Sequence, residues 1–264
     1  MTLRLNQDQI NRYQRDGHLS PIRVMTTAEA ARLREKTEAF EAAQGEPVHG
    51  TQTTKCCLLM PWVYDMVRRP EILDVVEDLI GPDILMYQNG AWFKEPESKS
   101  YVSWHQDLNY YGMDSLDLVT CWVALTEASK ENGCIQVMPG SHKGGMVGVD
   151  YSQVTPGNLL ASGQQSRYPV EEDKLVSMEL QPGEMSLHHS CAVHASHPNH
   201  SAGRRMGFSI ALMPPSVGQT TRLRATAMLM RGQDDYGHYE LEDRAPVSPT
   251  DADTVAYHER AVIL

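Results

Sequence analysis

From Pro82 onward the chain consists of short apolar or alternating runs separated by Gly, Pro, Asn and Asp. The runs are rich in β-forming residues, and each is only long enough for one strand. They are DILMYQNGAWFKE, LVTCWVAL, CIQVMPGS, KLVSMELQPGEMSLHH and RMGFSIALMP. Many short strands with turns between them are typical of a sandwich or barrel. This feature therefore predicts a mainly β core.

The preceding part of the chain carries helix signals instead. Asn6 with Gln9, and Thr26 with Glu29, have the spacing of a capping box, in which two side chains satisfy the first free amides of a helix. Pro70 suits the first turn of a further helix, because no amide hydrogen is needed there. The sequence therefore predicts flanking helices over about residues 6–17, 26–43 and 70–80.

No repeat, low-complexity tract or linker divides the chain. We therefore expect one domain with a helical part over about residues 1–82 and a β core over about residues 83–215. The remainder, about residues 216–264, is charged and irregular, which predicts either a covering segment or a partly ordered tail.

Composition excludes several classes of protein. The formal net charge is −11, and the outnumbered basic residues form no run, which argues against a nucleic-acid partner. The five cysteines lack paired CxxC spacing, which predicts reduced buried thiols. The first residues lack the apolar segment of a secretory signal, and no apolar run is long enough to cross a membrane. We expect a cytoplasmic monomer or homodimer that acts on a small molecule.

The candidate metal ligands begin with His105 and Asp107. Residues two apart in an extended segment point to the same side, so this imidazole and this carboxylate can converge on one ion. Such a tripeptide alone is weak evidence, and a second histidine is needed from far along the chain. The candidates are His188, His189, His194, His197 and His200.

Two imidazoles and one carboxylate on one face of an octahedral ion suit iron(II) oxygenases, because three positions stay open. Two of these positions would chelate 2-oxoglutarate, and the third would take O2. The far carboxylate of 2-oxoglutarate then requires a fixed cation, for which the planar guanidinium of Arg is well suited. Arg204 and Arg205 follow the histidine-rich segment at a distance compatible with the next strand of a hairpin.

These residues belong to a longer set of ordered motifs. The motifs are HQDLNYY at 105–111, CW at 121–122, NGCIQVMPGSHK at 132–143, HAS at 194–196, then Asn199 and Arg205. Together they resemble the phytanoyl-CoA dioxygenase family of iron(II)- and 2-oxoglutarate-dependent oxygenases. The resemblance spans roughly residues 88–212. It implies a double-stranded β-helix, the cupin-like jelly roll, with iron(II) at its mouth and 2-oxoglutarate and O2 as cosubstrates.

The resemblance also selects among the candidates. The family's distal ligand lies two residues before a Ser and five before an Asn, as His194 does before Ser196 and Asn199. The family's arginine for 2-oxoglutarate lies eleven positions after that ligand, which implies Arg205 rather than Arg204. Further positions that the resemblance places at the cosubstrate or the pocket are Ser196, Trp122, Gln88 and Lys55.

Two departures from close relatives bear on the reaction. Ala195 stands where the family usually has Gly, a small change that should leave ligation intact. Halogenating relatives carry Ala or Gly at the position of Asp107, so a carboxylate there favours hydroxylation. Tyr110 and Tyr111 either line the substrate pocket or cap the β-structure.

The resemblance implies a dioxygenase that hydroxylates an unactivated C–H bond of a small metabolite and releases succinate and CO2. The acidic balance of the chain favours a polar or zwitterionic substrate over a CoA ester, and the tyrosines could receive an amine by cation–π contact. One alternative is a non-enzymatic jelly-roll protein that binds a metal or ligand. Another is an oxygenase of the same fold that desaturates, epimerises or closes a ring.

Overall fold

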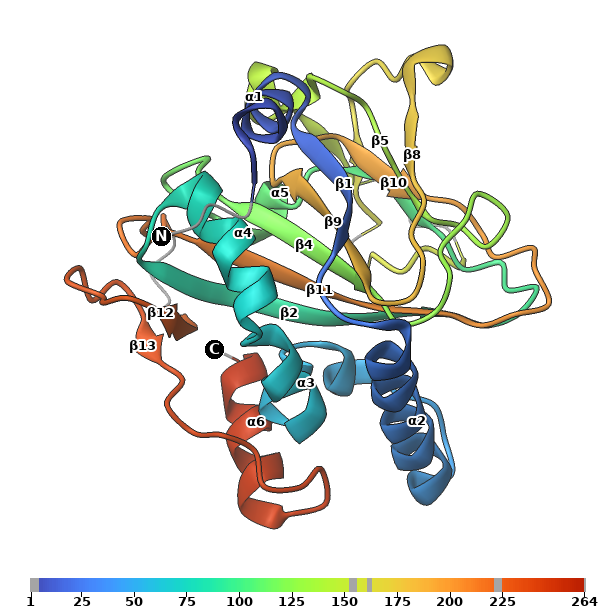
Figure 1. The fold of residues 1–264 in the computed structure, drawn as a ribbon, viewed down its shortest axis with the longest axis vertical. Coiled ribbons are helices and arrows are strands. Elements are labelled where there is room, and N and C mark those ends of the chain that lie inside the picture. Colours follow the sequence, from blue (N-terminus) through green and yellow to red (C-terminus); the bar gives the residue numbers. More distant parts are fainter. Residues whose placement is uncertain (1–4, 152–155, 161–162, 221–224, 264) are drawn as a thin grey trace.

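The computed structural model describes residues 5–151, 156–160, 163–220 and 225–263. Within them, strands form a seven-stranded sheet and a four-stranded sheet, as Figure 1 shows. The larger sheet has the order β1-β9-β4-β11-β2-β12-β13. Its strands are β1 (His18–Arg23), β2 (Ile84–Lys94), β4 (Val119–Ala124), β9 (Glu184–His189), β11 (Arg205–Met213), β12 (Thr226–Arg231) and β13 (Glu240–Leu241).

The smaller sheet has the order β3-β10-β5-β8, and its neighbouring strands are antiparallel. Its strands are β3 (Val102–His105), β5 (Ile135–Val137), β8 (Val176–Met178) and β10 (His194–Ser196). A separate pair consists of β6 (Val149–Asp150) and β7 (Gln165–Ser166). These sheets form a double-stranded β-helix, which confirms the prediction of a mainly β jelly roll with flanking helices.

The helices flank the larger sheet, and Figure 1 shows α4 running across its strands with α3 below β2. The α-helices are α1 (Gln7–Asp16), α2 (Thr27–Gln44), α3 (Pro61–Val67), α4 (Pro70–Ile80), α5 (Leu108–Tyr111) and α6 (Ala252–Ile263). The 3-10 turns are η1 (Gly50–Thr53), η2 (Cys56–Leu58), η3 (Ser141–Gly144) and η4 (Glu172–Lys174). Both expected capping boxes are present, at Asn6 with Gln9 and at Thr26 with Glu29.

Side-chain alternation gives the larger sheet two different faces. On β11, Met206, Phe208, Ile210 and Leu212 point into the core under the helices. The intervening Arg205 and Ser209 line a cavity on the opposite face. Strands β4 and β9 divide in the same way: Cys121 and Leu187 face the helices, whereas Thr120 and His188 face the cavity.

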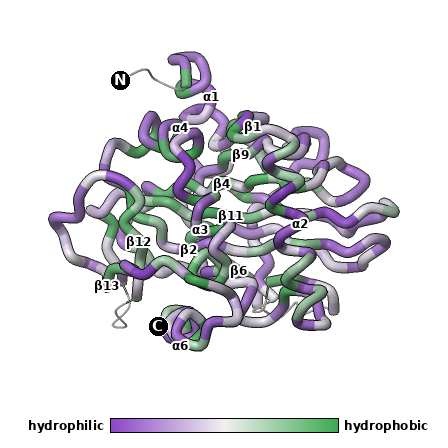
Figure 2. Tube along the Cα trace, turned by 60° about the horizontal axis from the view of Figure 1, so that its bottom comes forward, coloured by the Kyte–Doolittle hydropathy of each residue, from purple (hydrophilic) through white to green (hydrophobic). Residues whose placement is uncertain are grey.

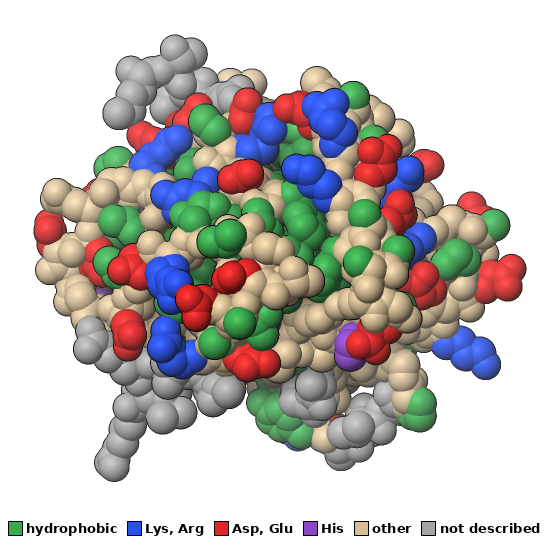
Figure 3. All heavy atoms as spheres, turned by 90° about the horizontal axis from the view of Figure 1, so that it is seen from below, with side chains coloured by type: hydrophobic (Ala, Val, Ile, Leu, Met, Phe, Trp, Pro, Cys, Tyr) green, Lys and Arg blue, Asp and Glu red, His purple; other side chains and the backbone are tan. Residues whose placement is uncertain are grey.

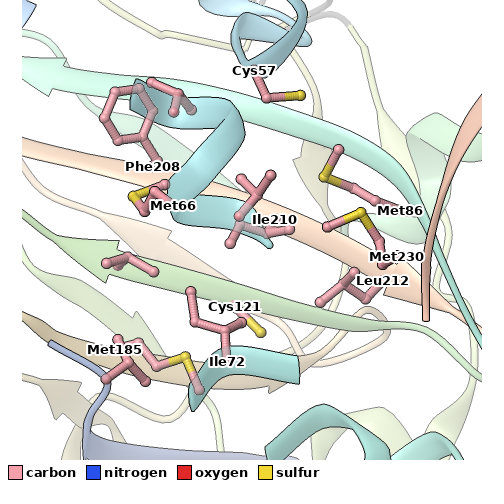
Figure 4. Close-up of a cluster of buried hydrophobic side chains, with 14 of the residues drawn as sticks. Cys57, Met66, Ile72, Met86, Cys121, Met185, Phe208, Ile210, Leu212 and Met230 are labelled. Carbon is pink, nitrogen blue, oxygen red and sulfur yellow. The ribbon is translucent and has the colours of Figure 1, made fainter. Parts of the chain in front are cut away.

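The core under the helices is rich in sulfur. Figure 4 shows Met66, Met185, Met230 and Cys121 among the aliphatic and aromatic side chains of this cluster. Methionine is unbranched and fills irregular gaps between helices and a twisted sheet. All five cysteines are buried and free, as their sequence spacing predicts.

The chain ends contribute more to the sheet than the sequence indicates. β1, from the segment predicted to be helical, pairs with β9, and β12, from the segment predicted to be irregular, pairs with β2. The C-terminal segment also contains α6, which packs near η2. The predicted β core of about residues 83–215 is therefore too narrow on both sides.

The surface carries mixed charge. Figure 3 shows acidic and basic side chains interspersed over the face seen from below in Figure 1. Figure 2 shows hydrophobic stretches on the central strands and hydrophilic stretches along α2. Within the described residues, no helix combines the length and apolar character needed to cross a bilayer.

Candidate active site

His105, Asp107 and His194 meet where β3 and β10 lie side by side. His105 ends β3, His194 begins β10, and the two are direct partners in the antiparallel pairing. Their imidazole centroids are 4.1 Å apart. Asp107 lies in the turn between β3 and α5, and the candidate ligand atoms of all three residues lie within 4.8 Å of one another. The fold therefore brings together the three predicted ligands from distant parts of the chain.

Backbone hydrogen bonds orient the two imidazoles. His105 Nδ1 lies 2.8 Å from the carbonyl of Ser103, and His194 Nδ1 lies 2.9 Å from that of Ala192. A carbonyl can only accept, so each Nδ1 carries the proton and each Nε2 keeps a lone pair. Both Nε2 atoms face Asp107 Oδ1, at 3.3 Å for His105 and 3.6 Å for His194. This is the arrangement that a metal ion between the three groups requires.

The two oxygens of Asp107 have different neighbours. Oδ2 accepts a hydrogen bond from the Thr120 hydroxyl at 2.6 Å and lies 3.1 Å from His188 Nε2. Oδ1 faces the two histidine Nε2 atoms instead. His188, one of the histidines considered as a ligand, thus supports the carboxylate from behind and leaves Oδ1 directed at the metal position.

Electrostatics keep these donors in the forms that bind a metal. Burial alone would raise the pKa of Asp107, but the neighbouring His194, His105 and His188 side chains hold it well below its usual value. Burial, together with the neighbouring histidines, lowers the pKa of His194 well below its usual value. At neutral pH the cluster therefore offers an ionised carboxylate and a neutral imidazole.

Arg205 is a buried cation with an incomplete set of partners. It is 1% exposed, and its guanidinium donates to the Gly133 carbonyl and the Ser196 hydroxyl at 3.0 Å and 2.9 Å. Its Nε has no hydrogen-bond partner, and no carboxylate of the described residues forms an ion pair with it. Burial lowers its pKa to about 10, so it stays positive at neutral pH. A buried cation without an anion is costly, and an incoming carboxylate would balance it.

The adjacent Arg204 lies in a different setting. It donates to both carboxylate oxygens of Glu41 at 2.6 Å and 2.8 Å, and to Glu95 at 2.7 Å. Its guanidinium also lies over the ring of Phe93, 5.1 Å from the centroid. Because its charge is already paired, Arg204 fixes surface elements, whereas Arg205 has no carboxylate partner among the described residues.

Trp122 and Gly207 help to hold the Arg205 guanidinium in place. It lies 4.9 Å from the centroid of Trp122, so the indole supports it by cation–π contact. Gly207 leaves room for that indole, because a Cβ there would lie 2.1 Å from a Trp122 ring atom. The sequence motifs do not single out Gly207, and the constraint becomes visible only where β11 and β4 pair.

Ser196 connects Arg205 to Lys94, a second buried cation that sequence reasoning missed. The Lys94 amine donates to the Ser196 hydroxyl at 2.5 Å, to the Ser196 carbonyl at 3.0 Å and to the carbonyl of His197. Burial, followed by the nearby charge of Arg205, lowers the pKa of Lys94 to about 6. Lys94 thus fixes the end of β10, and its burial favours the neutral amine more than in an exposed lysine.

Of the other residues predicted to contact the cosubstrate, three line the cavity and one does not. Gln88, Trp122 and Ser196 line the cavity with Arg205. Lys55 is absent from that lining: its amine pairs with Glu242 and donates to the Thr226 hydroxyl at 2.5 Å. Lys55 therefore joins η2 to the C-terminal segment, and the geometry does not favour the cosubstrate role expected for it.

The two candidate tyrosines line the cavity, whereas the remaining candidate histidines lie away from the ligand cluster. Tyr110 and Tyr111 line the cavity, and the Tyr110 ring lies 6.3 Å from that of His105. His189 points away from the ligand cluster: its Nδ1 accepts from the Cys191 amide at 3.0 Å. His197 and His200 are exposed.

The cavity between the ligand cluster and the surface has a volume of about 750 Å³. His105, Asp107 and His194 lie in its wall together with Arg205. A site with two imidazoles, one carboxylate and a nearby buried arginine fits iron(II) with a chelating dicarboxylate. Fold and site together define a non-haem iron oxygenase of the 2-oxoglutarate-dependent class.

Comparison with known proteins identifies the family to which the chain belongs. Residues 13–207 match the model of the phytanoyl-CoA dioxygenase family, and the chain belongs to that family. It is 31% identical over 229 residues to a probable alpha-ketoglutarate-dependent hypophosphite dioxygenase of Stutzerimonas stutzeri, an alignment covering 81% of this chain and 72% of that protein.

Two further relatives show the range of the family. The peroxisomal phytanoyl-CoA dioxygenase of Homo sapiens is 35% identical over 146 residues, which cover 53% of this chain and 42% of the human protein. Among solved structures, the apo form of the non-heme monooxygenase ThoJ superposes with a TM-score of 0.85 at 29% identity. That match covers 97% of this chain and 95% of ThoJ.

Proposed function

We propose that this protein is an iron(II)- and 2-oxoglutarate-dependent dioxygenase that hydroxylates a C–H bond of a small organic molecule. The observation that carries the proposal is the buried Arg205, which has no carboxylate partner among the described residues and lines the same cavity as His105, Asp107 and His194. A protein that only bound a metal would have no use for this cation.

Each residue has a defined role in this proposal. His105 Nε2, His194 Nε2 and Asp107 Oδ1 would hold iron(II), while Arg205 and the Ser196 hydroxyl would bind the far carboxylate of 2-oxoglutarate. When bound, iron(II), 2-oxoglutarate and O2 supply the oxidising chemistry, with succinate and CO2 as by-products. The protein fixes the positions of these groups and shields them in a largely apolar cavity.

The carboxylate of Asp107 favours hydroxylation among the possible outcomes. It fills a metal position that a halide ligand would need, and Thr120 and His188 hold it there. Desaturation, epimerisation and ring closure use the same centre and differ in how the substrate lies in the cavity. Analysis of the product distinguishes them.

The names of relatives suggest substrates without deciding among them. The relative from Stutzerimonas stutzeri is named for hypophosphite, and the human relative is named for phytanoyl-CoA. The aligned part covers less than half of the human protein. Location in the cytoplasm and a monomeric or dimeric state stay predictions.

The first test is conversion of 2-oxoglutarate to succinate by the purified protein with iron(II), ascorbate and O2. Arg205→Ala should raise the KM for 2-oxoglutarate by about 10²-fold, because a charged hydrogen-bonded pair contributes about 3 kcal/mol. Arg204→Ala is the matched control and should leave this KM within about twofold of the native value. Asp107→Ala should abolish turnover.

Two outcomes would contradict the proposal. One is an unchanged requirement for 2-oxoglutarate in Arg205→Ala. The other is full turnover in Asp107→Ala, which would remove the carboxylate from the metal centre. If the protein binds iron(II) but forms no succinate with any candidate substrate, the non-enzymatic alternative is supported instead.

A further inference from the structure

The cavity has an unusual balance of charge for a site expected to take a polar or zwitterionic metabolite. Among the described residues of its lining, Asp107 and Arg205 are the only Asp, Glu, Lys or Arg side chains. Both are already committed, one to the metal and the other to the cosubstrate. His49 lies near the surface, 3.8 Å from Glu46, and the other three lining histidines surround the metal position.

The loaded centre leaves no charge for a substrate to pair with. Two positive charges on iron(II) and one on Arg205 balance those of Asp107 and the two carboxylates of 2-oxoglutarate. A substrate bearing a full charge would lose its water without gaining a counter-ion, which costs several kcal/mol. Ammonium, phosphate and carboxylate groups are therefore disfavoured within the cavity.

The cavity wall instead suits an apolar body. Val102, Ile135 and Leu160 line it and are at most 8% exposed. The rings of Trp92 and Tyr110 add aromatic surface, and Tyr110 is 40% exposed. An exposed aromatic ring beside an apolar wall provides a favourable entry for a hydrophobic molecule.

Uncharged polar groups are available within this wall. Gln88 and Tyr111 line the cavity, and neither the Gln88 side-chain amide nor the Tyr111 hydroxyl is hydrogen-bonded to another of the described residues. An amide and a phenol can each donate and accept, so they pair with a hydroxyl or carbonyl oxygen. The volume of about 750 Å³ must also hold iron(II) and 2-oxoglutarate, so the substrate takes the part of the cavity that these groups leave.

We infer that the substrate is an uncharged amphipathic organic molecule with an apolar carbon body and a hydroxyl or carbonyl group. The inference rests on the proposed function and specifies the substrate class for that same site. It replaces the zwitterionic metabolite that the composition of the chain favours, because the local lining rather than the net charge determines desolvation.

Binding of matched probes tests this inference without relying on turnover. The protein is loaded with iron(II) and 2-oxoglutarate without O2, and Nile red, an uncharged amphipathic dye, is bound and then displaced. The competitors are 1-adamantanemethanol, adamantane-1-carboxylate and 1-adamantylmethylammonium, which share one carbon skeleton. The alcohol should displace the dye at a concentration at least about tenfold lower than either ion, which corresponds to about 1.4 kcal/mol.

Variants of the cavity wall show whether the probes bind there. Leu160→Lys adds a cation to the lining and should shift the preference to the carboxylate, whereas Leu160→Met should keep the preference for the alcohol. Thr54→Lys, at a half-buried lining position, repeats the test if Leu160→Lys does not fold. The inference is overturned if Nile red does not bind, or if an ion competes as well as the alcohol in the native protein.

A turnover measurement on the same preparation separates this inference from the proposed function. Succinate formation that hypophosphite stimulates would overturn the uncharged substrate class while supporting the dioxygenase. If Arg205→Ala keeps the native dependence on 2-oxoglutarate, the proposed dioxygenase function is overturned whichever probe binds. Stimulation by an uncharged alcohol or ketone, with none by hypophosphite, would support both.

Discussion

The two faces of the seven-stranded sheet bury different kinds of side chain. The face under the helices packs Phe208, Ile210 and several methionine side chains. The cavity face carries Arg205 and supports Asp107 through Thr120. Neighbouring residues of one strand therefore serve different purposes, so stability and chemistry should respond separately to substitutions one position apart.

The largest expected effect on the helix side comes from Phe208→Ala. This side chain is fully buried and packs against Phe93 with ring centroids 5.5 Å apart. Its truncation should lower the free energy of unfolding by about 3–5 kcal/mol, because a cavity replaces a buried ring. Chemical denaturation measures the loss. The folded fraction should retain the native KM for 2-oxoglutarate, and a large change in that KM would show that the two faces are coupled.

A smaller effect should come from Lys94, whose burial without a carboxylate makes stability depend on pH. Its pKa is lowered from 10.5 to about 6 in the fold, so between these values the unfolded chain binds a proton that the folded chain lacks. This penalty is absent above the unfolded pKa and grows as the pH falls towards 6. Lys94→Met removes this pH dependence. As the pH falls from about 9 to about 7, the unfolding free energy of the variant should therefore rise relative to that of the native protein by about 1.4 kcal/mol per pH unit.

Lys55 provides the control for this experiment because it is also buried but is paired with Glu242. Lys55→Met leaves that carboxylate buried without its cation and should destabilise the fold. Parallel curves of unfolding free energy against pH for native protein and Lys94→Met would contradict the assignment of Lys94 as a buried unpaired base.

The smallest predicted effect concerns Gly207, which belongs to the cavity face between two residues of the helix face. Its replacement by Ala would place a methyl group 2.1 Å from a Trp122 ring atom, so the indole must move away from Arg205. We expect the KM for 2-oxoglutarate to rise by about tenfold, or about 1.4 kcal/mol. Gly203→Ala is the control, since its nearest neighbour would be 3.9 Å away. Equal KM values in the two variants would refute this role for Gly207.

Much of the fold could be predicted because local patterns determine it. The capping boxes at Asn6 and Thr26 fix where two helices begin, and alternation along β4 and β11 predicts which residues share a face. Alternation does not identify the neighbouring strand, however. The entry of β1 and β12 into the large sheet depends on pairing with β9 and β2, far away in sequence.

In the candidate site, too, some residues could be predicted from the sequence and others could not. The spacing around His105, Asp107 and His194 carries a chemical pattern, and the structure brings these residues together. Lys94 carries no such pattern, because lysine in a strand is ordinarily exposed and its burial depends on the carbonyls of β10. The support of Asp107 by His188 likewise requires knowing that β9 runs beside β4.

The strict alternation of β11 also limits how this enzyme can diversify. Inserting or deleting one residue between Arg205 and Phe208 would turn one of these two side chains to the wrong face of the sheet. Changes in chain length are therefore better tolerated in loops, such as the one that contains Leu159 and Leu160, two residues that line the cavity outside the sheets. New substrates can be accommodated there while the strand that carries the arginine keeps its length.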